Sequence, residues 1–257
     1  MTNNLLVFQS DFGLVDGAVS AMIGVALQEE PSLGVHHLTH DITPYNTFEA
    51  SYRLFQTVEY WPEGTTFVSV VDPGVGSSRK SVVALTKTGQ YIVTPDNGTL
   101  SYIKKVVGIV AVREISEVEN RRSNTELSYT FHGRDVYAYT GAKLASGHIS
   151  FEEVGPELPV DKILELPVVE TIIEDNLVRG AIDILDVRFG SLWTSITRDD
   201  FYALEPNFGD RFEVTIFNND MLVYQNQVTY GKSFADVRIG QPIIYINSLY
   251  LSCWLSH

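Results

Sequence analysis

Cysteine is almost missing from this chain of 257 residues, which contains Cys253 alone. One thiol cannot form an intrachain disulfide or a thiolate cluster for zinc, so structural cross-links of both kinds are excluded. Their absence is typical of a protein from a reducing compartment. We therefore expect a cytoplasmic protein, for which 44% hydrophobic residues are ample to build a core.

Positive charge and long apolar runs are also scarce. Only 18 Lys and Arg stand against 32 Asp and Glu, with no basic stripe of the kind that neutralises nucleic-acid phosphates. No apolar segment reaches the roughly 18 residues of a membrane-spanning helix, and the N-terminal residues lack the basic start of a signal peptide. We expect neither nucleic acid nor a membrane as a partner.

The residue pattern divides the chain into two parts. Up to about residue 160, short β-branched runs such as LLVF and TFVSVVD alternate with helical patterns, as in an α/β layer fold. Beyond it, turn residues separate strand-like runs without a clear helical period. We predict an α/β domain at 1–160, with a central β-sheet flanked by helices, and a smaller, mostly β domain at 161–257.

Capping residues and periodicity predict the individual elements. The helices are expected at 16–30 with Asp16 as N-cap, at 47–60 with Thr47 as N-cap, and at 135–146 before Gly147. The strands of the second domain are expected at 178–196, 211–217, 221–228 and 242–247.

The segment SVVDPGVGSSRK, residues 69–80, has the glycines of a phosphate-binding loop. A P-loop needs Gly, four residues, Gly, Lys and then Ser or Thr, so the spacing of Gly74 and Gly76 excludes one. Asp72 at a strand end and Arg79, seven residues later, can instead share one site. The alternative is an ordinary turn with a surface ion pair.

Two acidic residues lie in the segment SDFGLVDGAVSAM. Asp11 follows the first predicted strand, where a carboxylate can bind the hydroxyls of a ribose, although a metal ion is a competing ligand. Asp16 opens the first predicted helix and is either a simple cap or part of the same site.

Histidines occur in two segments that bear on catalysis and metal binding. His132 in YTFHGRDVYAY precedes the third predicted helix and can transfer a proton near neutral pH, although a structural role is its alternative. His36 and His40 are four residues apart, which suits a metal on a helix. Their run indicates a strand, where these positions lie roughly 13 Å apart, so we expect no metal site.

The segment LDVRFGSLWTSI of the second domain contains an acidic residue and two aromatic ones. Asp186, Phe189 and Trp193 can form a wall suited to a cationic ligand with a flat ring. The alternative is that the aromatic side chains belong to the core.

Together these segments resemble a known family. SDFG with a following Asp, VDPGVGS with a following Arg, FHGRD, and DxxFGxxxT followed by NS are similar to the motifs of the S-adenosyl-L-methionine hydroxide adenosyltransferases, relatives of fluorinase and chlorinase. The resemblance covers nearly the whole chain. It implies a C-terminal barrel-like β domain, a homotrimer with sites between subunits, and cleavage of S-adenosyl-L-methionine (SAM) by water to adenosine and L-methionine, without cofactor or metal.

The resemblance also implies roles for individual residues. Asp72, Arg79 and His132 match the triad that holds the attacking water or hydroxide. Asp11 matches the carboxylate that binds the ribose hydroxyls, and Tyr45 matches an aromatic position near the ribose. The matches for the methionine part and the aromatic wall are Asp16 and Asp186 for the amino group, Ser248 for the carboxylate, and Phe189 and Trp193 for the wall.

This chemistry suits the residue types. The sulfonium leaves as a neutral thioether, so the reaction needs a water held in line with the C–S bond and a proton acceptor. Arg79 can stabilise hydroxide by its charge. The sequence leaves open whether Asp72 or His132 takes the proton.

The chain also departs from the family pattern. Ser191 and Ser195 stand where asparagines are usual, and the tail YINSLYLSCWLSH is altered, so adenine recognition is expected to be looser or supplied otherwise. Three alternatives remain: a protein that binds adenosine or SAM without turnover, a halogenase, which Asp72 and His132 disfavour, and a metal-dependent hydrolase such as a phosphatase.

Overall fold

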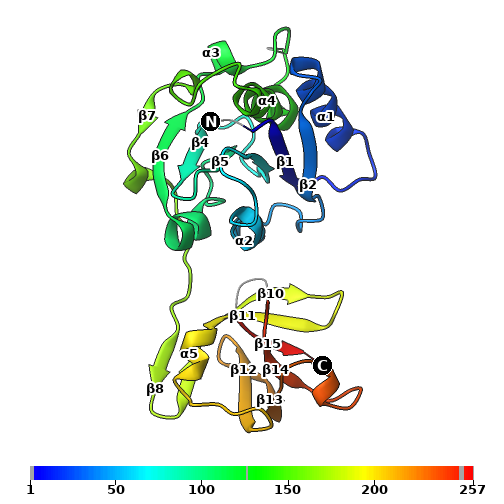
Figure 1. The fold of residues 1–257 in the computed structure, drawn as a ribbon, viewed down its shortest axis with the longest axis vertical. Helices are drawn as coiled ribbons and strands as arrows, with labels where there is room; N and C mark the ends of the chain where they lie inside the picture. Colours follow the sequence, from blue (N-terminus) through cyan, green and yellow to red (C-terminus); the bar gives the residue numbers. More distant parts are fainter. Residues whose placement is uncertain (1–2, 126, 249–251, 257) are drawn as a thin grey trace. The chain divides into compact units, whose positions relative to one another are not determined.

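A computed structural model describes residues 3–125, 127–248 and 252–256. The chain divides into two compact units, Met1–Leu166 and Pro167–His257 (Figure 1). Within the described residues, no helix is both long and apolar enough to cross a membrane.

The N-terminal unit is built on a seven-stranded mixed sheet in the order β2-β1-β3-β5-β4-β6-β7. The strands β2, β1, β3 and β5 are parallel, whereas β4 is antiparallel to its two neighbours and β7 is antiparallel to β6. The bounds are Leu5–Ser10 (β1), Gly34–Thr39 (β2), Thr66–Val70 (β3), Ser81–Thr86 (β4), Tyr91–Pro95 (β5), Ile109–Glu114 (β6) and Glu157–Leu158 (β7).

Helices cover both faces of this sheet. Leu6 and Phe8 of β1 share a buried cluster with residues of α1 and α4. The side-chain amide of Gln9 instead donates to the Ala50 carbonyl of α2. Because alternate residues of a strand point to opposite faces, α2 covers the face opposite to α1 and α4. The bounds are Ala18–Glu29 (α1), Thr47–Val58 (α2), Glu117–Asn120 (α3), Tyr139–Ser146 (α4), and the π-helical turns Ile103–Val107 (η1) and Gly133–Ala138 (η2).

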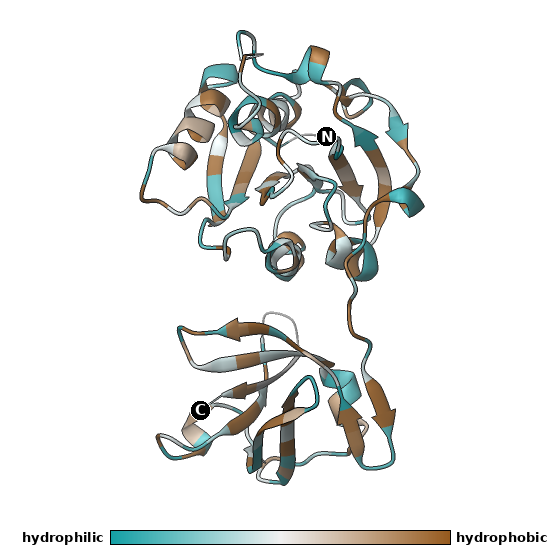
Figure 2. Cartoon of the chain, turned by 180° about the vertical axis from the view of Figure 1, so that it is seen from behind, coloured by the Kyte–Doolittle hydropathy of each residue, from teal (hydrophilic) through white to brown (hydrophobic). Residues whose placement is uncertain are grey.

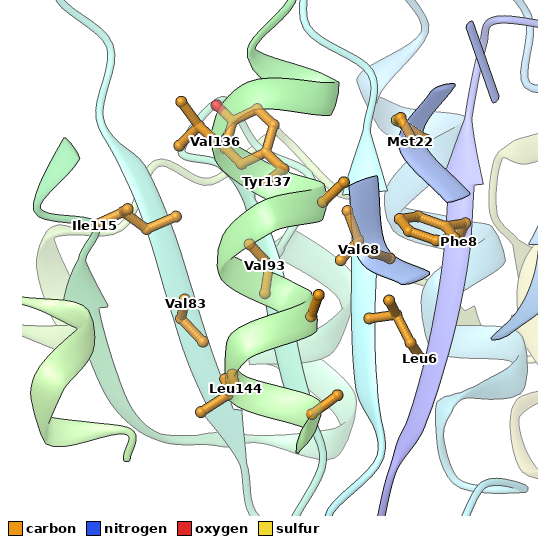
Figure 3. Packing of buried hydrophobic residues seen from close by; sticks show 14 of the residues in the cluster. Leu6, Phe8, Met22, Val68, Val83, Val93, Ile115, Val136, Tyr137 and Leu144 are labelled. Carbon is orange, nitrogen blue, oxygen red and sulfur yellow. The ribbon is translucent and has the colours of Figure 1, made fainter. Parts of the chain in front are cut away.

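The core between α4 and the sheet is shown in Figure 3. Side chains from four strands pack there against the helical segment, to which Tyr137 and Leu144 belong. The labelled strand residues are Leu6 and Phe8 of β1, Val68 of β3, Val83 of β4 and Val93 of β5. This packing explains why the strands carry much of the apolar colour in Figure 2.

The C-terminal unit is mostly β. Its six-stranded sheet has the order β10-β11-β15-β14-β13-β12, with β13 and β14 parallel and the other pairs antiparallel. Its bounds are Ile172–Glu174 (β8) and Leu177–Arg179 (β9) in a separate hairpin, Ile182–Asp186 (β10), Ser191–Thr197 (β11), Arg198–Tyr202 (α5), Arg211–Asn218 (β12), Met221–Tyr230 (β13), Ile243–Ile246 (β14) and Ser252–Ser256 (β15).

Two predicted helix starts in the N-terminal unit are wrong by a residue or two. Gly17 rather than Asp16 is the N-cap of α1, and Asp16 Oδ1 accepts from the Ala18 N–H at 2.8 Å. Asn46 caps α2, because its side chain reaches the Glu49 N–H. The predicted end of the third helix at Gly147 is confirmed by its left-handed φ of 75°.

The prediction of one strand at 178–196 is wrong, because three strands occupy that range. Gly190, with φ of 65°, makes the turn between β10 and β11 possible. The short helix α5 was missed, although Thr197 and Asp200 form a capping box at its start. The predicted strands at 211–217, 221–228 and 242–247 are confirmed within two residues by β12, β13 and β14.

Two helical glycines give a test of the packing on the sheet. A Cβ at Gly141 of α4 would overlap Val68 Cγ2 of β3, whereas one at Gly24 of α1 would meet no atom within 4 Å. We expect Gly141→Ala to lower the free energy of unfolding by about 1–3 kcal/mol through overpacking. The control Gly24→Ala should raise it by about 0.5–1 kcal/mol, because alanine favours the helix. Urea unfolding would contradict the packing if both variants gained stability.

Candidate active site

Three neighbouring parallel strands bring the separate motifs together. The strands β2, β1 and β3 are adjacent and parallel, so their carboxyl ends lie at one edge of the sheet. Asp11 directly follows β1, His40 directly follows β2, and Asp72 follows β3 two residues later. Ligands commonly bind at this edge of α/β sheets.

A pocket of about 280 Å³ opens at the same edge. Four of the residues singled out in the sequence line it, namely Asp11, Tyr45, Asp72 and His132. Further lining comes from Phe12, Pro44, Val70, Val75, Thr130, Phe131 and Gly133. The pocket therefore combines two carboxylates and an imidazole with apolar walls.

Arg79 holds both oxygens of the Asp72 carboxylate. Its Nε donates to Oδ1 at 2.7 Å, and its Nη2 donates to Oδ2. Nη1 donates to Ser81 Oγ at 3.0 Å, and the guanidinium lies 5.6 Å from the ring centre of Tyr137. The side chains of Asp72 and Arg79 are only 6% and 11% exposed, so they form a buried pair rather than a surface one. Arg79 does not itself line the pocket and acts on it through Asp72.

The imidazole of His132 is buried and ready to accept a proton. Its Nδ1 lies 3.1 Å from the Tyr129 carbonyl oxygen, which can only accept, so Nδ1 carries the proton and Nε2 carries the lone pair. Burial lowers the pKa of His132 from its usual value, and nearby Glu117 opposes that shift. The ring is therefore neutral at pH 7.

Asp11 is anchored by the backbone of Tyr45. The Tyr45 N–H donates to Asp11 Oδ2 at 2.8 Å. Tyr45 has a φ of +67°, in the left-handed region, which costs a residue with a Cβ about 1–2 kcal/mol. This strained residue directs its N–H at Asp11, and as a whole it is 71% exposed beside the pocket.

A chain of three polar side chains, of which Ser10 and His40 are buried, supports the loop that carries Asp11. His40 Nδ1 lies 2.7 Å from Ser10 Oγ, and His40 Nε2 lies 2.8 Å from His37 Nδ1. The His40 carbonyl also accepts from the Gly13 N–H at 2.8 Å. Burial lowers the pKa of His40 to about 4, and the proximity of His37 adds to this effect. His40 is therefore neutral at pH 7 and joins two loops of the site.

The other predicted residues lie outside this pocket. Asp16 is exposed at the start of α1. Asp186, Phe189, Trp193 and Ser248 belong to the C-terminal unit, where Phe189 is 73% exposed and Trp193 is buried. A second, mostly apolar pocket of about 580 Å³ in that unit is lined by other residues than these four.

Both serines that depart from the family pattern are bonded within the C-terminal unit. Ser191 is buried and its Oγ donates to Ser256 Oγ at 3.2 Å, and Ser195 Oγ accepts from the Ala181 N–H at 2.9 Å. The altered tail contributes β15, which pairs with both β11 and β14. Residues 249–251 and 257 of the tail lie outside the described residues, as do the side chains of Cys253 and Trp254.

Sequence reasoning missed three supporting side chains. Glu117 faces His132, and Arg121 holds Glu117, but neither lies in a motif. His40 lies in a segment whose spacing bears only on metal binding. In the described part of the chain, no group of three or more His, Cys, Asp or Glu side chains is arranged to hold a metal ion.

The fold and the site define the class of this protein. It is an α/β protein with a pocket, lined by carboxylates and a histidine, at the carboxyl ends of its parallel strands. The SAM hydroxide adenosyltransferase N-terminal domain model matches residues 6–155, and the C-terminal domain model matches residues 180–252. The chain therefore belongs to the SAM hydroxide adenosyltransferase family, and the resemblance seen in the sequence is confirmed.

Individual relatives agree with this assignment. The chain is 36% identical to the (R)-S-adenosyl-L-methionine hydrolase of Salinispora tropica, over 94% of this chain and 85% of the relative. It is 26% identical to the fluorinase of Actinopolyspora mzabensis, over 95% and 87%. Its fold matches the crystal structure of an uncharacterized conserved protein from Thermotoga maritima with a TM-score of 0.89, at 32% identity, over 97% and 91%.

The lowered pKa of His40 predicts how stability depends on pH. The folded protein resists protonation of His40 until about pH 4, whereas the unfolded chain takes up that proton near pH 6.5. The stability due to neutral His40 is therefore complete above pH 6.5 and is lost as the pH falls toward 4.

We expect His40→Gln to lose about 1–3 kcal/mol at pH 7, with a shallower decline in the free energy of unfolding between pH 6.5 and 4. Urea unfolding at several pH values measures both quantities. His36→Gln, an exposed position on β2, is the control and should keep the slope of the parent protein. Equal slopes in His40→Gln and the parent would show that His40 is not the titrating group.

Proposed function

We propose that this protein hydrolyses SAM to adenosine and L-methionine. The observation that carries the proposal is the meeting of Asp11, Asp72 and His132 in one pocket, in a chain that belongs to this family. Its relatives of 36% and 34% identity are named (R)-S-adenosyl-L-methionine hydrolase. A carboxylate for the ribose and a proton acceptor for water are the groups that this reaction needs.

In the proposed reaction the oxygen of a water attacks the ribose C5′. The C–S bond breaks and its electron pair stays on sulfur, so methionine leaves as a neutral thioether. The sulfonium is already activated, and we therefore propose a reaction without metal or cofactor. The attacking water loses one proton for each SAM cleaved, and the site must accept it.

The proposed roles follow from the hydrogen bonds. Arg79 donates hydrogen bonds to both oxygens of Asp72, which keeps the carboxylate in place to orient the water. His132 Nε2 carries a free lone pair, so we propose His132 as the proton acceptor. Asp11, held by the Tyr45 N–H, is proposed to bind the ribose hydroxyls.

The substrate-binding part of the proposal extends to the second unit. We propose that Pro167–His257 acts as a barrel-like substrate-binding domain. Asp186 and Asp16 would receive the methionine amino group, Ser248 its carboxylate, and Phe189 and Trp193 the flat and cationic parts of SAM. A cytoplasmic homotrimer with sites between subunits is part of the same proposal, supported by the family resemblance.

The test is incubation with SAM in the presence of a chelator, followed by chromatography. We expect equal amounts of adenosine and methionine, and a loss of about 10²–10⁴-fold in kcat for His132→Ala. The control is His148→Ala, because His148 pairs with Glu29 and Glu30 at the surface. If no adenosine forms at any enzyme concentration, the proposal is wrong and a protein that only binds its ligand is indicated. A chloride-dependent nucleoside would indicate a halogenase, and loss of activity with chelator a metal-dependent hydrolase.

The Asp72–Arg79 pair allows stability and activity to be separated. Arg79→Gln leaves a buried carboxylate without its counter-charge, so we expect a loss of about 3–5 kcal/mol in the free energy of unfolding. The double variant Asp72→Asn, Arg79→Gln removes both charges and should recover part of that stability without recovering turnover. Urea unfolding and adenosine formation measure the two effects. Arg198→Gln, which breaks an exposed pair with Asp199, is the control. Turnover restored in the double variant would rule out a catalytic role for the pair.

A further inference from the structure

Glu117 lies beside His132, although it belongs to none of the sequence motifs. Its Oε1 is 3.7 Å from His132 Nε2. This separation is too long for a hydrogen bond, but it is well within the range in which an opposite charge changes the pKa of a titrating group. Glu117 comes from the short helix α3, whereas His132 precedes η2.

Arg121 fixes the carboxylate of Glu117 in this orientation. Its Nη1 donates to Glu117 Oε2 at 2.9 Å, and its side chain is 7% exposed. Nη2 donates to the Ser128 carbonyl at 3.0 Å, and the guanidinium lies 4.5 Å from the ring centre of Tyr129. One oxygen of Glu117 is therefore held by Arg121, while the other faces the imidazole.

Both ring nitrogens of His132 face acceptors that suit its protonated form. Nδ1–H already donates to the Tyr129 carbonyl, and a proton added at Nε2 would point to an acceptor, Glu117 Oε1, that needs only a small approach. A buried imidazolium without a counter-charge is costly, because burial disfavours the charged form. Glu117 supplies the missing negative charge before the proton arrives.

The other charges near His132 largely cancel as pairs. Arg79 disfavours the imidazolium and Asp72 favours it, and these two form one ion pair. Arg121 also disfavours it, and its partner is Glu117. Removal of the Glu117 charge therefore leaves Arg121 unmatched beside His132, which adds to the effect. The ring of Tyr129, 6.1 Å away, completes the surroundings.

We propose that Glu117 is a positioning residue that sets the proton affinity of His132. It forms an ion pair with the imidazolium that arises when His132 takes the proton of the attacking water. The part of this proposal that concerns the attacking water and its proton rests on the proposed function. The interaction between the two side chains is a property of the free protein and can be measured without substrate.

The test compares Glu117→Gln with the parent protein by NMR titration of the histidine ring signals, with His132 assigned through His132→Gln. We expect the proton affinity of His132 to fall about tenfold in Glu117→Gln, since a nearby carboxylate is lost. In the assay, kcat at high pH should fall about three- to tenfold, because a weaker base accepts the proton less well. The acid limb of the pH profile should move to lower pH.

Two further variants make the result specific. Glu119→Gln removes a neighbouring charge on α3, where the carboxylate accepts from Ser116 Oγ, and should leave the His132 titration unchanged. Glu117→Asp keeps the charge on a shorter side chain and should recover part of the proton affinity. A folded Glu117→Gln with the parent titration, or an equal change in Glu119→Gln, would overturn the proposal. If the His132 titration changes in Glu117→Gln but the parent protein forms no adenosine, the interaction is confirmed and the proposed function is refuted.

Discussion

Parallel pairing of β1 with both β2 and β3 is the constraint on which the pocket depends. Parallel strands end at the same edge of a sheet, so the residues that follow them must lie side by side. Asp11 and Asp72 are sixty-one positions apart in the chain, yet each comes just after one of two adjacent strands. The helix that follows His132 then packs across the sheet and brings the imidazole to the same edge.

The charged side chains beside His132 are arranged in ion pairs. Asp72 is matched with Arg79, and Glu117 with Arg121, and all but Glu117 are largely buried. Buried charges need such partners, because transfer out of water costs several kcal/mol for each ion. The neutral imidazole of His132 stands between the two pairs. A proton taken up by His132 at this site lies beside a carboxylate oxygen, because Glu117 Oε1 faces Nε2 of the ring.

Backbone strain at Tyr45 and the buried side chain of His40 support the part of the pocket that contains Asp11. Tyr45 adopts a left-handed backbone to direct its N–H at Asp11, and His40 links the end of β1 to His37. Such a conformation persists only where the surrounding structure enforces it. Here the surrounding structure includes the His40 carbonyl, which accepts from Gly13. The position of Asp11 therefore depends on the backbone of Tyr45 and on the loop that follows β2.

Much of the fold could be predicted from local pattern, because apolar periodicity and turn residues act over a few positions. The strands β12, β13 and β14 and the end of α4 followed from such signals, whereas the break of 178–196 into three strands did not. The motif residues Asp11, Asp72 and His132 could be named from residue type and from family resemblance. Glu117, Arg121 and His40 could not, because their roles arise from contacts between loops and no spacing in the sequence marks them.

By itself, then, the sequence determined the α/β pattern, the family and the identity of the chemical groups. Only the tertiary structure decided that Arg79 is bound to Asp72, that the lone pair of His132 is on Nε2, and that a carboxylate faces it. The physical reason is that residue types fix which protons and charges are available. Their pKa values and partners depend on burial and on distances of a few ångströms between segments far apart in the chain.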